Sequence, residues 1–122
     1  MIRVAVVDDE PTMRAVLEDL VSGQGGLELV GSGASADEAV ELARSLRPDV
    51  ILLDVMLPGG GPMAARRILE CSPGTAVVAI SAHTDGGNVS RMIDAGAVSY
   101  LAKGRSSTLD IISAIEAAAD SG

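Results

Sequence analysis

The sequence predicts an α/β fold in which a doubly wound, five-stranded parallel sheet is covered by helices on both faces. Two observations support this prediction. Short hydrophobic runs alternate five times with segments whose apolar residues recur at helical spacing. The runs are also too continuously apolar to leave one face of a sheet in water, which is typical of parallel strands buried on both sides. We therefore expect right-handed crossovers between the strands.

The first part of the chain shows both patterns. A strand is predicted from Ile2 to Val7, followed by a helix in which Pro11 occupies an early position and Gly23 ends the last turn. After a turn at 24–26, a short strand runs from Leu27 to Gly31. The apolar positions that define the helix are Met13, Val16, Leu17, Leu20 and Val21. One amphipathic helix therefore separates the first two strands.

The rest of the chain continues the alternation. Ser35 and Glu38 form a capping box that opens a helix through Leu46, and Pro48 ends it. A strand near 50–54 follows. Further helices are expected at about 62–72, 88–95 and 107–119, with strands near 76–81 and 98–102. We therefore expect a single domain that spans residues 1–122.

Composition narrows the classes of function. Of 122 residues 48% are hydrophobic, but Tyr100 is the only aromatic residue, which argues against a ring-lined cavity for a large organic cofactor. The net charge of −8, from 9 basic and 17 acidic residues, repels nucleic acid and anionic membranes. No apolar run approaches the roughly 18 residues of a membrane span. Cys71 is the only cysteine, so no internal disulfide forms, and we expect a cytoplasmic protein.

Reactive side chains follow four of the predicted strands. Asp8 and Asp9 come directly after the first strand, and Asp54 ends the third. Ser81 ends the fourth strand, and Lys103 follows the fifth. Ligands of open parallel sheets collect at the carboxyl ends of the strands. Because the strands are predicted to be parallel, we expect these side chains to meet at that end of the sheet.

Three carboxylates brought close together repel one another unless they share a cation. Hard oxygen ligands in small number suit Mg²⁺, which typically uses one or two carboxylates together with phosphate oxygens. The acids Asp8, Asp9 and Asp54 beside Lys103 therefore indicate phosphoryl chemistry. In this interpretation Asp54 supplies the attacking oxygen, Lys103 neutralises charge on the phosphoryl group, and Ser81 donates a hydrogen bond to it.

Each of these residues also has an ordinary structural explanation when it is taken alone. Adjacent acids after a strand, such as Asp8 and Asp9, commonly cap the next helix. A serine like Ser81 is commonly a turn residue, and a lysine like Lys103 is commonly a solvated loop charge. Only the combination of the acids, the hydroxyl and the ammonium favours a functional site.

Four segments near the ends of predicted strands share the pattern of one family. They are Val-Val-Asp-Asp-Glu at 6–10, Leu-Leu-Asp-Val-Met-Leu-Pro-Gly-Gly-Gly at 52–61, Ile-Ser-Ala at 80–82 and Tyr-Leu-Ala-Lys at 100–103. On these segments the chain resembles the receiver domains of two-component response regulators over essentially its full length. The resemblance implies a flavodoxin-like (βα)5 fold with strand order 2-1-3-4-5.

The resemblance also implies how the phosphoacceptor and its cofactor are arranged. Asp54 is expected to accept the phosphoryl group. Mg²⁺ is the expected cofactor, held by Asp8, Asp9, Asp54 and the main-chain carbonyl of Met56.

Ser81 and Lys103 are expected, by the same resemblance, to bind the phosphoryl oxygens. Tyr100 matches the aromatic switch position of the family, whose ring turns inward when the hydroxyl residue moves toward phosphate. Taken alone, Tyr100 is also compatible with a half-buried strand aromatic. The sequence therefore leaves both interpretations of Tyr100 open, a switch residue and a strand aromatic.

Several positions depart from the family pattern or lie close to the site. Gly104 stands where many receivers have proline, and residues 100–107 are most similar to receivers of helix-turn-helix regulators of the nitrate-response and quorum-sensing class. Residues 59–61 are all glycine, which predicts a loop that orders on phosphorylation or partner binding. His83 is predicted to be a solvated loop histidine. Glycines at 86–87 are predicted to precede the fourth helix and permit loop motion.

These features predict a phosphorylation-operated switch rather than a metabolic enzyme. Asp54 is expected to take a phosphoryl group from a histidine kinase, or from a small donor such as acetyl phosphate, and to lose it to water. We expect the output to be a change in self-association, such as homodimerisation, or in effector contacts. By family analogy, we expect the natural protein to continue past Gly122 into an effector domain that binds DNA and regulates transcription.

Two other functions fit the same fold. One is a receiver-like scaffold that works by constitutive contacts without phosphorylation, which the intact set of acids, hydroxyl and lysine argues against. The other is a phosphohydrolase that forms an aspartyl-phosphate. No second acid stands two positions after Asp54, and the chain has no cap domain for substrate selection, so we place this alternative last.

Overall fold

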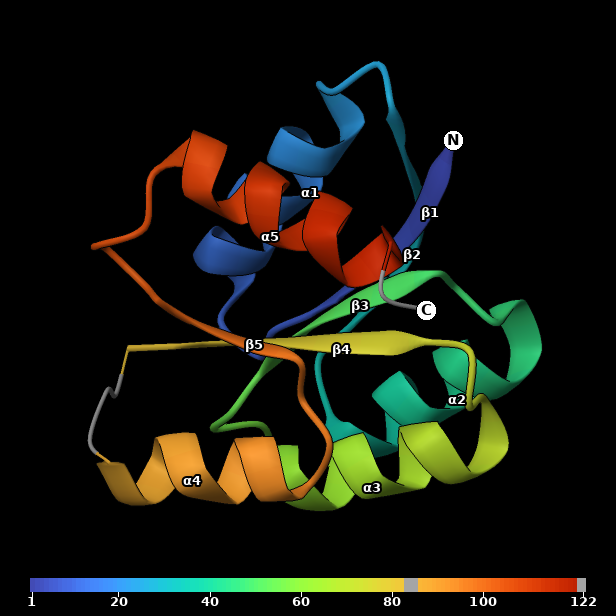
Figure 1. Cartoon of the computed structure of the whole chain (residues 1–122), viewed down its shortest axis with the longest axis vertical. Coiled ribbons are helices and arrows are strands. Elements are labelled where there is room, and N and C mark those ends of the chain that lie inside the picture. Colours follow the sequence, from blue (N-terminus) through green and yellow to red (C-terminus); the bar gives the residue numbers. More distant parts are fainter. Residues whose placement is uncertain (83–85, 121–122) are drawn as a thin grey trace.

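The computed structural model describes residues 1–82 and 86–120, which form five strands and five helices (Figure 1). The strands lie side by side in the order β2-β1-β3-β4-β5, and every neighbouring pair is parallel. The predicted fold class and strand order are therefore confirmed. The strands are β1 (Ile2–Val7), β2 (Leu27–Gly33), β3 (Val50–Asp54), β4 (Ala76–Ser81) and β5 (Ser99–Ala102). The helices are α1 (Pro11–Ser22), α2 (Ala36–Leu46), α3 (Gly61–Cys71), α4 (Gly86–Asp94) and α5 (Thr108–Asp120).

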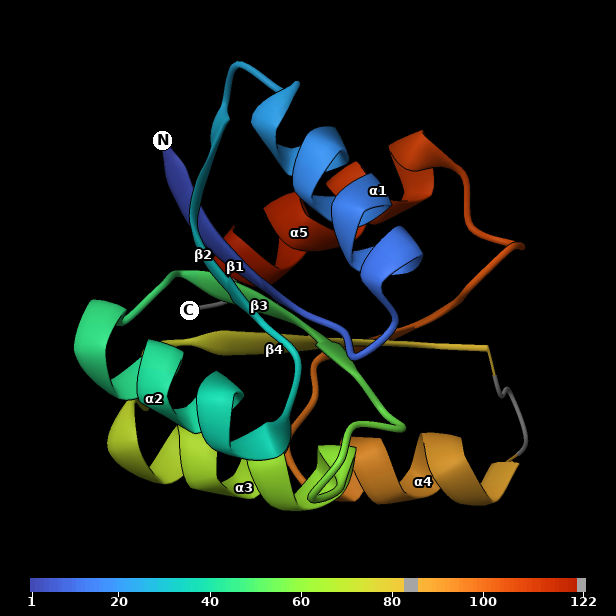
Figure 2. The same ribbon diagram turned by 180° about the vertical axis from the view of Figure 1, so that it is seen from behind.

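Helices cover both faces of the sheet. α1 and α5 lie on one face and α2, α3 and α4 on the other (Figure 1 and Figure 2). Side chains of one strand alternate between the two faces, so Val4 and Val6 of β1 pack with α1 and α5, whereas Ala5 and Val7 pack with α2 and α3. All four side chains are fully buried. This burial on both faces explains the continuous hydrophobic runs in the sequence.

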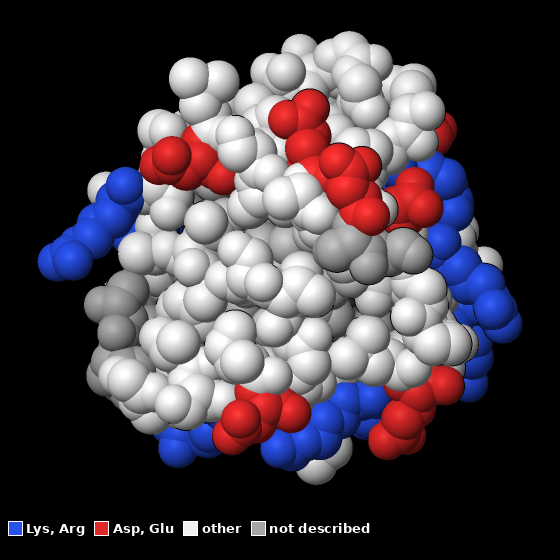
Figure 3. Space-filling view, in the orientation of Figure 1, with Lys and Arg blue, Asp and Glu red and all other residues white. Residues whose placement is uncertain are grey.

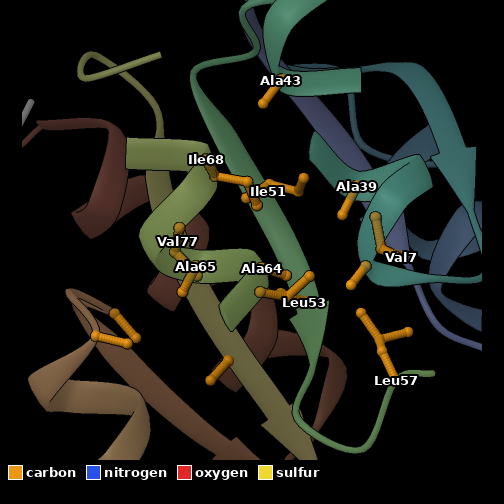
Figure 4. Close-up of a cluster of buried hydrophobic side chains, with 14 of the residues drawn as sticks. Val7, Ala39, Ala43, Ile51, Leu53, Leu57, Ala64, Ala65, Ile68 and Val77 are labelled. Atoms are coloured by element: carbon orange, nitrogen blue, oxygen red, sulfur yellow. The ribbon is translucent and has the colours of Figure 1, made fainter. Parts of the chain in front are cut away.

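Small side chains bring α2 and α3 close to the sheet. Ile51 and Leu53 of β3 point toward Ala39 of α2 and toward Ala64 and Ala65 of α3 (Figure 4). We call this group, together with the other residues of the same face, the alanine-rich cluster. Its buried members are Ala5, Val7, Ala36, Ala39, Val40, Ala43, Ile51, Leu53, Val55, Leu57, Ala64, Ala65, Ile68, Val77, Ala79, Met92, Ala95 and Ala97.

The capping box predicted at the start of α2 forms in a modified way. Ser35 Oγ accepts a hydrogen bond from the Glu38 N–H at 3.2 Å, as predicted. Glu38 Oε1 reaches back one residue further than the usual motif and accepts from the Ala34 N–H at 3.0 Å. The side chains of Ser35 and Glu38 therefore fix both the first turn of α2 and the chain that enters it.

Two predicted boundaries differ from the structure. β2 continues two residues past Gly31 to Gly33, because the Asp8 N–H donates to the Gly33 carbonyl and prolongs the pairing with β1. The glycines at 86–87 lie in the first turn of α4 rather than in a loop before it. The prediction that they act as loop glycines is therefore wrong, and both are exposed at the start of the helix.

The register of the sheet aligns the carboxyl ends of the strands. Val7 pairs with Leu53, Asp54 pairs with Ile80, and Ser81 pairs with Ala102. The residues at or just past these pairs therefore emerge together at one end of the sheet. None of the helices in the described part of the chain has the length and hydrophobicity needed to cross a bilayer.

Candidate functional site

Three charged side chains meet where β1, β3 and β5 end. Asp8 follows the last residue of β1, Asp54 is the last residue of β3, and Lys103 follows the last residue of β5. Lys103 Nζ lies 2.7 Å from Asp8 Oδ2 and 3.4 Å from Asp54 Oδ2. The Lys103 N–H also donates to the Ser81 carbonyl at 2.8 Å, which extends the pairing of β5 with β4. The sheet itself thus positions the predicted acid and lysine residues together.

The two carboxylates are removed from water. Asp8 is fully buried and Asp54 is 3% exposed, and the Lys103 side chain is 16% exposed. Burying a charge is unfavourable unless it is paired, and here one ammonium faces two carboxylates. The site therefore carries uncompensated negative charge in a poorly solvated position.

The acids can hold a metal ion. Asp8, Asp9 and Asp54 each offer one carboxylate oxygen within 4.8 Å of the others, and Asp9 is exposed at the mouth of the site. Asp8 Oδ2 is buried and accepts no well-formed hydrogen bond from the described residues, although the Lys103 ammonium lies beside it. Oxygen donors that leave other positions to water and phosphate suit Mg²⁺. The residues present therefore fit the predicted Mg²⁺.

Asp8 is held by the start of α1. Its Oδ1 accepts a hydrogen bond from the Glu10 N–H at 2.9 Å, and Arg14 Nη1 donates to its main-chain carbonyl at 3.1 Å. Glu10 is the cap of α1, since its carboxylate accepts from the Met13 N–H at 3.2 Å. The capping role that the sequence left open for the acid pair therefore falls to Glu10. Sequence analysis missed Arg14, whose only signal is a basic residue one turn into the helix.

The loop after Asp54 leaves the main-chain carbonyl of Met56 available. The Met56 N–H donates to Asp54 Oδ1 at 3.1 Å. The carbonyl of Val55 accepts from the Gly61 N–H at 3.0 Å, and that of Leu57 accepts from the Gly60 N–H at 2.8 Å. The Met56 carbonyl between them accepts no backbone hydrogen bond from the residues that the structure describes. An unused carbonyl two residues after Asp54 is compatible with the predicted metal ligand.

The three glycines of this loop have a structural role without phosphorylation. Gly59 and Gly60 have φ values of 95° and 92°, a conformation that favours glycine. A Cβ at Gly61 would lie 2.5 Å from the Val55 carbonyl oxygen, so a side chain there collides with the backbone. The prediction of a loop that orders only on phosphorylation or partner binding is therefore wrong. The glycines allow a tight turn that is already hydrogen-bonded.

Burial and charge change the pKa values of two site residues in the metal-free protein. Burial raises the pKa of Asp54, with a further contribution from the nearby Asp8, and these effects outweigh the Met56 N–H and the Lys103 charge. Burial alone would lower the pKa of Lys103. The close ion pair with Asp8, together with the charge of Asp54, outweighs it and raises that pKa. Lys103 therefore stays protonated, and the negative charge on the buried Asp54 destabilises the folded protein.

The remaining predicted residues lie on β4 and β5 or beyond the described part of the chain. Ser81 is fully buried at the end of β4. Tyr100 is partly buried in β5 and packs against the alanine-rich cluster. Gly104 has a φ of 79°, which glycine adopts without strain. His83 lies outside the described residues.

Comparison with known proteins gives consistent matches. A sequence model of the response regulator receiver domain matches residues 4–116. The response regulator GacA of Pseudomonas viridiflava is 40% identical over 105 residues, which are 85% of this chain and 49% of GacA. The response regulator UvrY of Escherichia coli K12 is 32% identical over 116 residues, which are 94% of this chain and 53% of UvrY. The chain thus spans about half the length of these curated relatives.

A solved structure shows the same architecture. The signal receiver domain of NarL from Mycobacterium tuberculosis superimposes with a TM-score of 0.93 at 32% sequence identity. The alignment covers 99% of this chain and 98% of the NarL receiver domain. The similarity therefore extends over the whole sheet and all the flanking helices.

Proposed function

The chain belongs to the response regulator receiver domain family, and on this premise we propose that it is a switch operated by phosphorylation of Asp54. The observation that carries the proposal is the pairing of Lys103 with two buried carboxylates at the carboxyl ends of the strands. A purely structural ion pair needs only one of these acids. A site that accepts a phosphoryl group needs the second acid as a nucleophile and the ammonium as a counter-charge.

Asp8, Asp9, Asp54 and the Met56 main-chain carbonyl would hold Mg²⁺. When bound, Mg²⁺ supplies positive charge that neutralises the acids and the phosphoryl oxygens. Lys103 already lies within 3.4 Å of Asp54 Oδ2, so its ammonium is positioned beside any oxygen added there.

The reaction transfers one phosphoryl group. An Asp54 carboxylate oxygen attacks the phosphorus of a phosphohistidine on a histidine kinase. The new O–P bond forms as the N–P bond breaks, and the histidine leaves with the electron pair. Hydrolysis of the resulting acyl phosphate later returns the carboxylate and inorganic phosphate. Receiver domains interact with histidine kinases and are generally not enzymes, and we propose self-phosphorylation and dephosphorylation as the whole of this chain's chemistry.

Ser81 and Tyr100 would convert the new phosphoryl group into a change at the surface. Ser81 ends β4 beside β5, and its partner in the register is Ala102, two residues after Tyr100. A shift of Ser81 toward the phosphoryl oxygens would therefore act on the strand that carries Tyr100. Because Tyr100 is only partly buried, its ring has room to report that shift.

The output surface would be formed by α4, β5 and α5. The middle of the face seen in Figure 1 is largely uncharged, and acidic and basic side chains gather around its rim (Figure 3). Ile93 of α4 and Val98 just before β5 are 47% and 51% exposed, although both are large and apolar. We propose that this surface supports homodimerisation or contact with a DNA-binding effector domain in a cytoplasmic regulator of transcription.

Intact mass spectrometry tests the phosphorylation directly. Incubation with acetyl phosphate and Mg²⁺ is expected to add the mass of one phosphoryl group to the native chain. Asp54→Asn and treatment with EDTA should each abolish the gain. Asp19→Asn removes a carboxylate from the exposed side of α1 and should leave it unchanged.

Two outcomes would favour the alternative functions. If the native chain gains no mass and binds no beryllofluoride, the chain is a receiver-like scaffold and its acid cluster is structural. If it turns over an added phosphomonoester, the phosphohydrolase alternative is correct.

A further inference from the structure

The outer part of the β3–α3 loop rests on the first turn of α2. The Ala36 N–H donates a hydrogen bond of 2.9 Å to the Pro58 carbonyl. Ala36 is the first helical residue after the Ser35 cap, so its N–H has no carbonyl partner within the helix. The loop therefore satisfies a donor of α2 that would otherwise face water, and α2 in turn holds the loop.

Ala36 and Gly59 leave no room for a second Cβ atom at this contact. A Cβ at Gly59 would lie 2.8 Å from the Ala36 Cβ, which is closer than two carbon atoms approach in real structures. Ala36 is 2% exposed, so it has no open space to move into. Gly60 differs, because a Cβ there would meet nothing closer than the Met63 Cβ at 4.0 Å. Gly59 is thus the loop glycine at which α2 leaves no space for a side chain.

The same loop carries the main-chain carbonyl of Met56. Between Asp54 and Gly59 lie four residues, 55–58, and Val55 and Leu57 are each only 4% exposed. The Gly60 N–H ties the far end of the turn back to the Leu57 carbonyl. Few backbone torsions between Gly59 and Met56 can therefore change freely, so a displacement of Gly59 also displaces the Met56 carbonyl.

We propose that Ala36 and Gly59 are positioning residues for Mg²⁺, because their fit fixes where the Met56 carbonyl points. This inference rests on the proposed function, which gives that carbonyl its role. Neither residue has a side chain that can bind a cation, and Ala36 lies on α2, an element that supplies none of the site residues. Helix α2 thus becomes part of the support of the phosphorylation site, and changes in its packing are transmitted to the metal.

A double-mutant cycle tests the contact. The variants are Gly59→Ala, Ala36→Gly and the pair together, with Gly60→Ala as the matched control. Gly59 and Gly60 have φ values of 95° and 92°, so an alanine brings backbone strain at either position. Only Gly59→Ala adds a collision with α2. Each variant is melted in EDTA and over a series of MgCl2 concentrations, and the rise in melting temperature gives the Mg²⁺ affinity.

Gly59→Ala is expected to weaken Mg²⁺ binding by about tenfold, as removal of supporting contacts around metal ligands typically does. Ala36→Gly in the same chain should recover most of that loss, because it removes the carbon atom that the new Cβ meets. Gly60→Ala should change the affinity by less than about threefold, because the loop remains free of α2 there. Ala36→Gly should not improve Mg²⁺ binding in the Gly60→Ala background.

The outcomes separate this inference from the function on which it rests. Absence of Mg²⁺ binding by the native chain would overturn both. Normal Mg²⁺ binding by Gly59→Ala, or equal weakening by Gly60→Ala, would overturn the positioning role and leave the phosphorylation site intact. If Gly59→Ala alone does not fold, the double variant with Ala36→Gly is compared with Ala36→Gly alone. A folded double variant whose Mg²⁺ affinity lies within about threefold of that of Ala36→Gly supports the contact, and a double variant that does not fold, or that binds Mg²⁺ about tenfold more weakly, contradicts it.

Discussion

Buried polar side chains lie at both ends of the parallel strands, but the two ends treat them differently. Before the amino end of β4, Thr75 Oγ1 donates to the Pro48 carbonyl at 2.7 Å and lies 2.7 Å from Ser72 Oγ. Ser72 and Thr75 are 3% and 2% exposed, so these hydrogen bonds satisfy groups that water cannot reach. The amino ends therefore use their buried polar groups to stabilise the fold.

The carboxyl ends hold charges that oppose one another. Asp8 and Asp54 share the ammonium of Lys103, and Asp8 Oδ2 is the one buried side-chain polar atom of the described residues without a well-formed hydrogen bond. Such an arrangement destabilises the metal-free protein. The carboxyl ends of the strands thus keep a charge imbalance that a cation and a phosphoryl group can relieve. The unfolding free energy lost by a substitution at the carboxyl ends should therefore depend on Mg²⁺. The loss caused by a substitution at the amino ends should not.

The largest effect is expected from removing the ammonium. Lys103→Met leaves Asp8 and Asp54 buried without a counter-charge, and removing one partner of a buried ion pair costs about 3 kcal/mol of unfolding free energy. Because Mg²⁺ can supply the missing charge, MgCl2 should recover most of this loss. Urea melts at pH 8 in EDTA and in MgCl2 measure the difference.

Lys103→Arg is the control for this variant, since it keeps the charge. It should lose less stability in EDTA than Lys103→Met does. An equal loss of stability with and without Mg²⁺ would show that Lys103 acts by packing rather than by charge.

A smaller effect, independent of the metal, is expected at the amino ends. Thr75→Val removes the hydroxyl and leaves the Pro48 carbonyl and Ser72 Oγ short of a partner, which should cost about 2 kcal/mol. Thr75→Ser keeps the hydroxyl and should lose less. The same urea melts apply, and a loss that shrinks in MgCl2 would contradict the separation between the two ends.

Removing the charge of Asp54 should stabilise the metal-free protein. The pKa of Asp54 is raised by burial, so the folded state binds its proton more tightly than the unfolded state does. Stability from this group is therefore present below the ordinary carboxyl pKa and is lost as pH rises through the raised value. At neutral pH in EDTA, Asp54→Asn should gain about 1 kcal/mol, within the range typical of stabilising changes at functional sites.

The pH dependence of the melting temperature provides the check on this gain. In EDTA, the advantage of Asp54→Asn over the native chain should grow as pH rises through the titration of Asp54 and then level off. Asp19→Asn, which removes an exposed acid, should show no such change. A native chain more stable than Asp54→Asn at neutral pH would show that the Lys103 pairing outweighs the cost of burial.

The sequence predicted Asp8, Asp54 and Lys103 as candidate site residues because each ends a strand or follows one directly. Once the strands are parallel, Asp8, Asp54 and Lys103 must emerge at the same end of the sheet, and the family resemblance adds their roles. The contact between Ala36 and Gly59 could not be predicted, since it depends on how closely α2 approaches a loop 23 residues further along the chain. Periodicity and propensity describe single elements, and they carry no information on such distances between elements.

The glycines illustrate the same difference. The run at 59–61 was predicted to order only on phosphorylation or partner binding, but hydrogen bonds to Val55 and Leu57 and the contact with Ala36 already hold it. Tertiary contacts thus decided the outcome where local composition indicated freedom. Arg14 escaped notice for a related reason, because a main-chain carbonyl leaves no mark in the sequence.

The smallest change in unfolding free energy is expected from Arg14, which combines a structural hydrogen bond with a charge near the acids. Its guanidinium donates to the Asp8 carbonyl, as a structural group would, but it also places a positive charge close to the acids. Arg14→Gln should therefore cost about 0.5–1 kcal/mol in EDTA, less than a buried charged hydrogen bond, because the Arg14 side chain is partly exposed and solvent screens its charge. Mg²⁺ should recover only the part of the loss that comes from charge.

Two controls separate the charge of Arg14 from its hydrogen bond. Arg14→Lys keeps the charge and should show a loss that Mg²⁺ does not change. Arg105→Gln removes an exposed arginine two residues after Lys103 and should have little effect in either condition, because screened surface charges contribute little. If Arg105→Gln and Arg14→Gln lose equal unfolding free energy in EDTA and in MgCl2, the charge of Arg14 acts only through the general field of the protein. The negative charge at the carboxyl ends of the strands is then compensated by Lys103 alone.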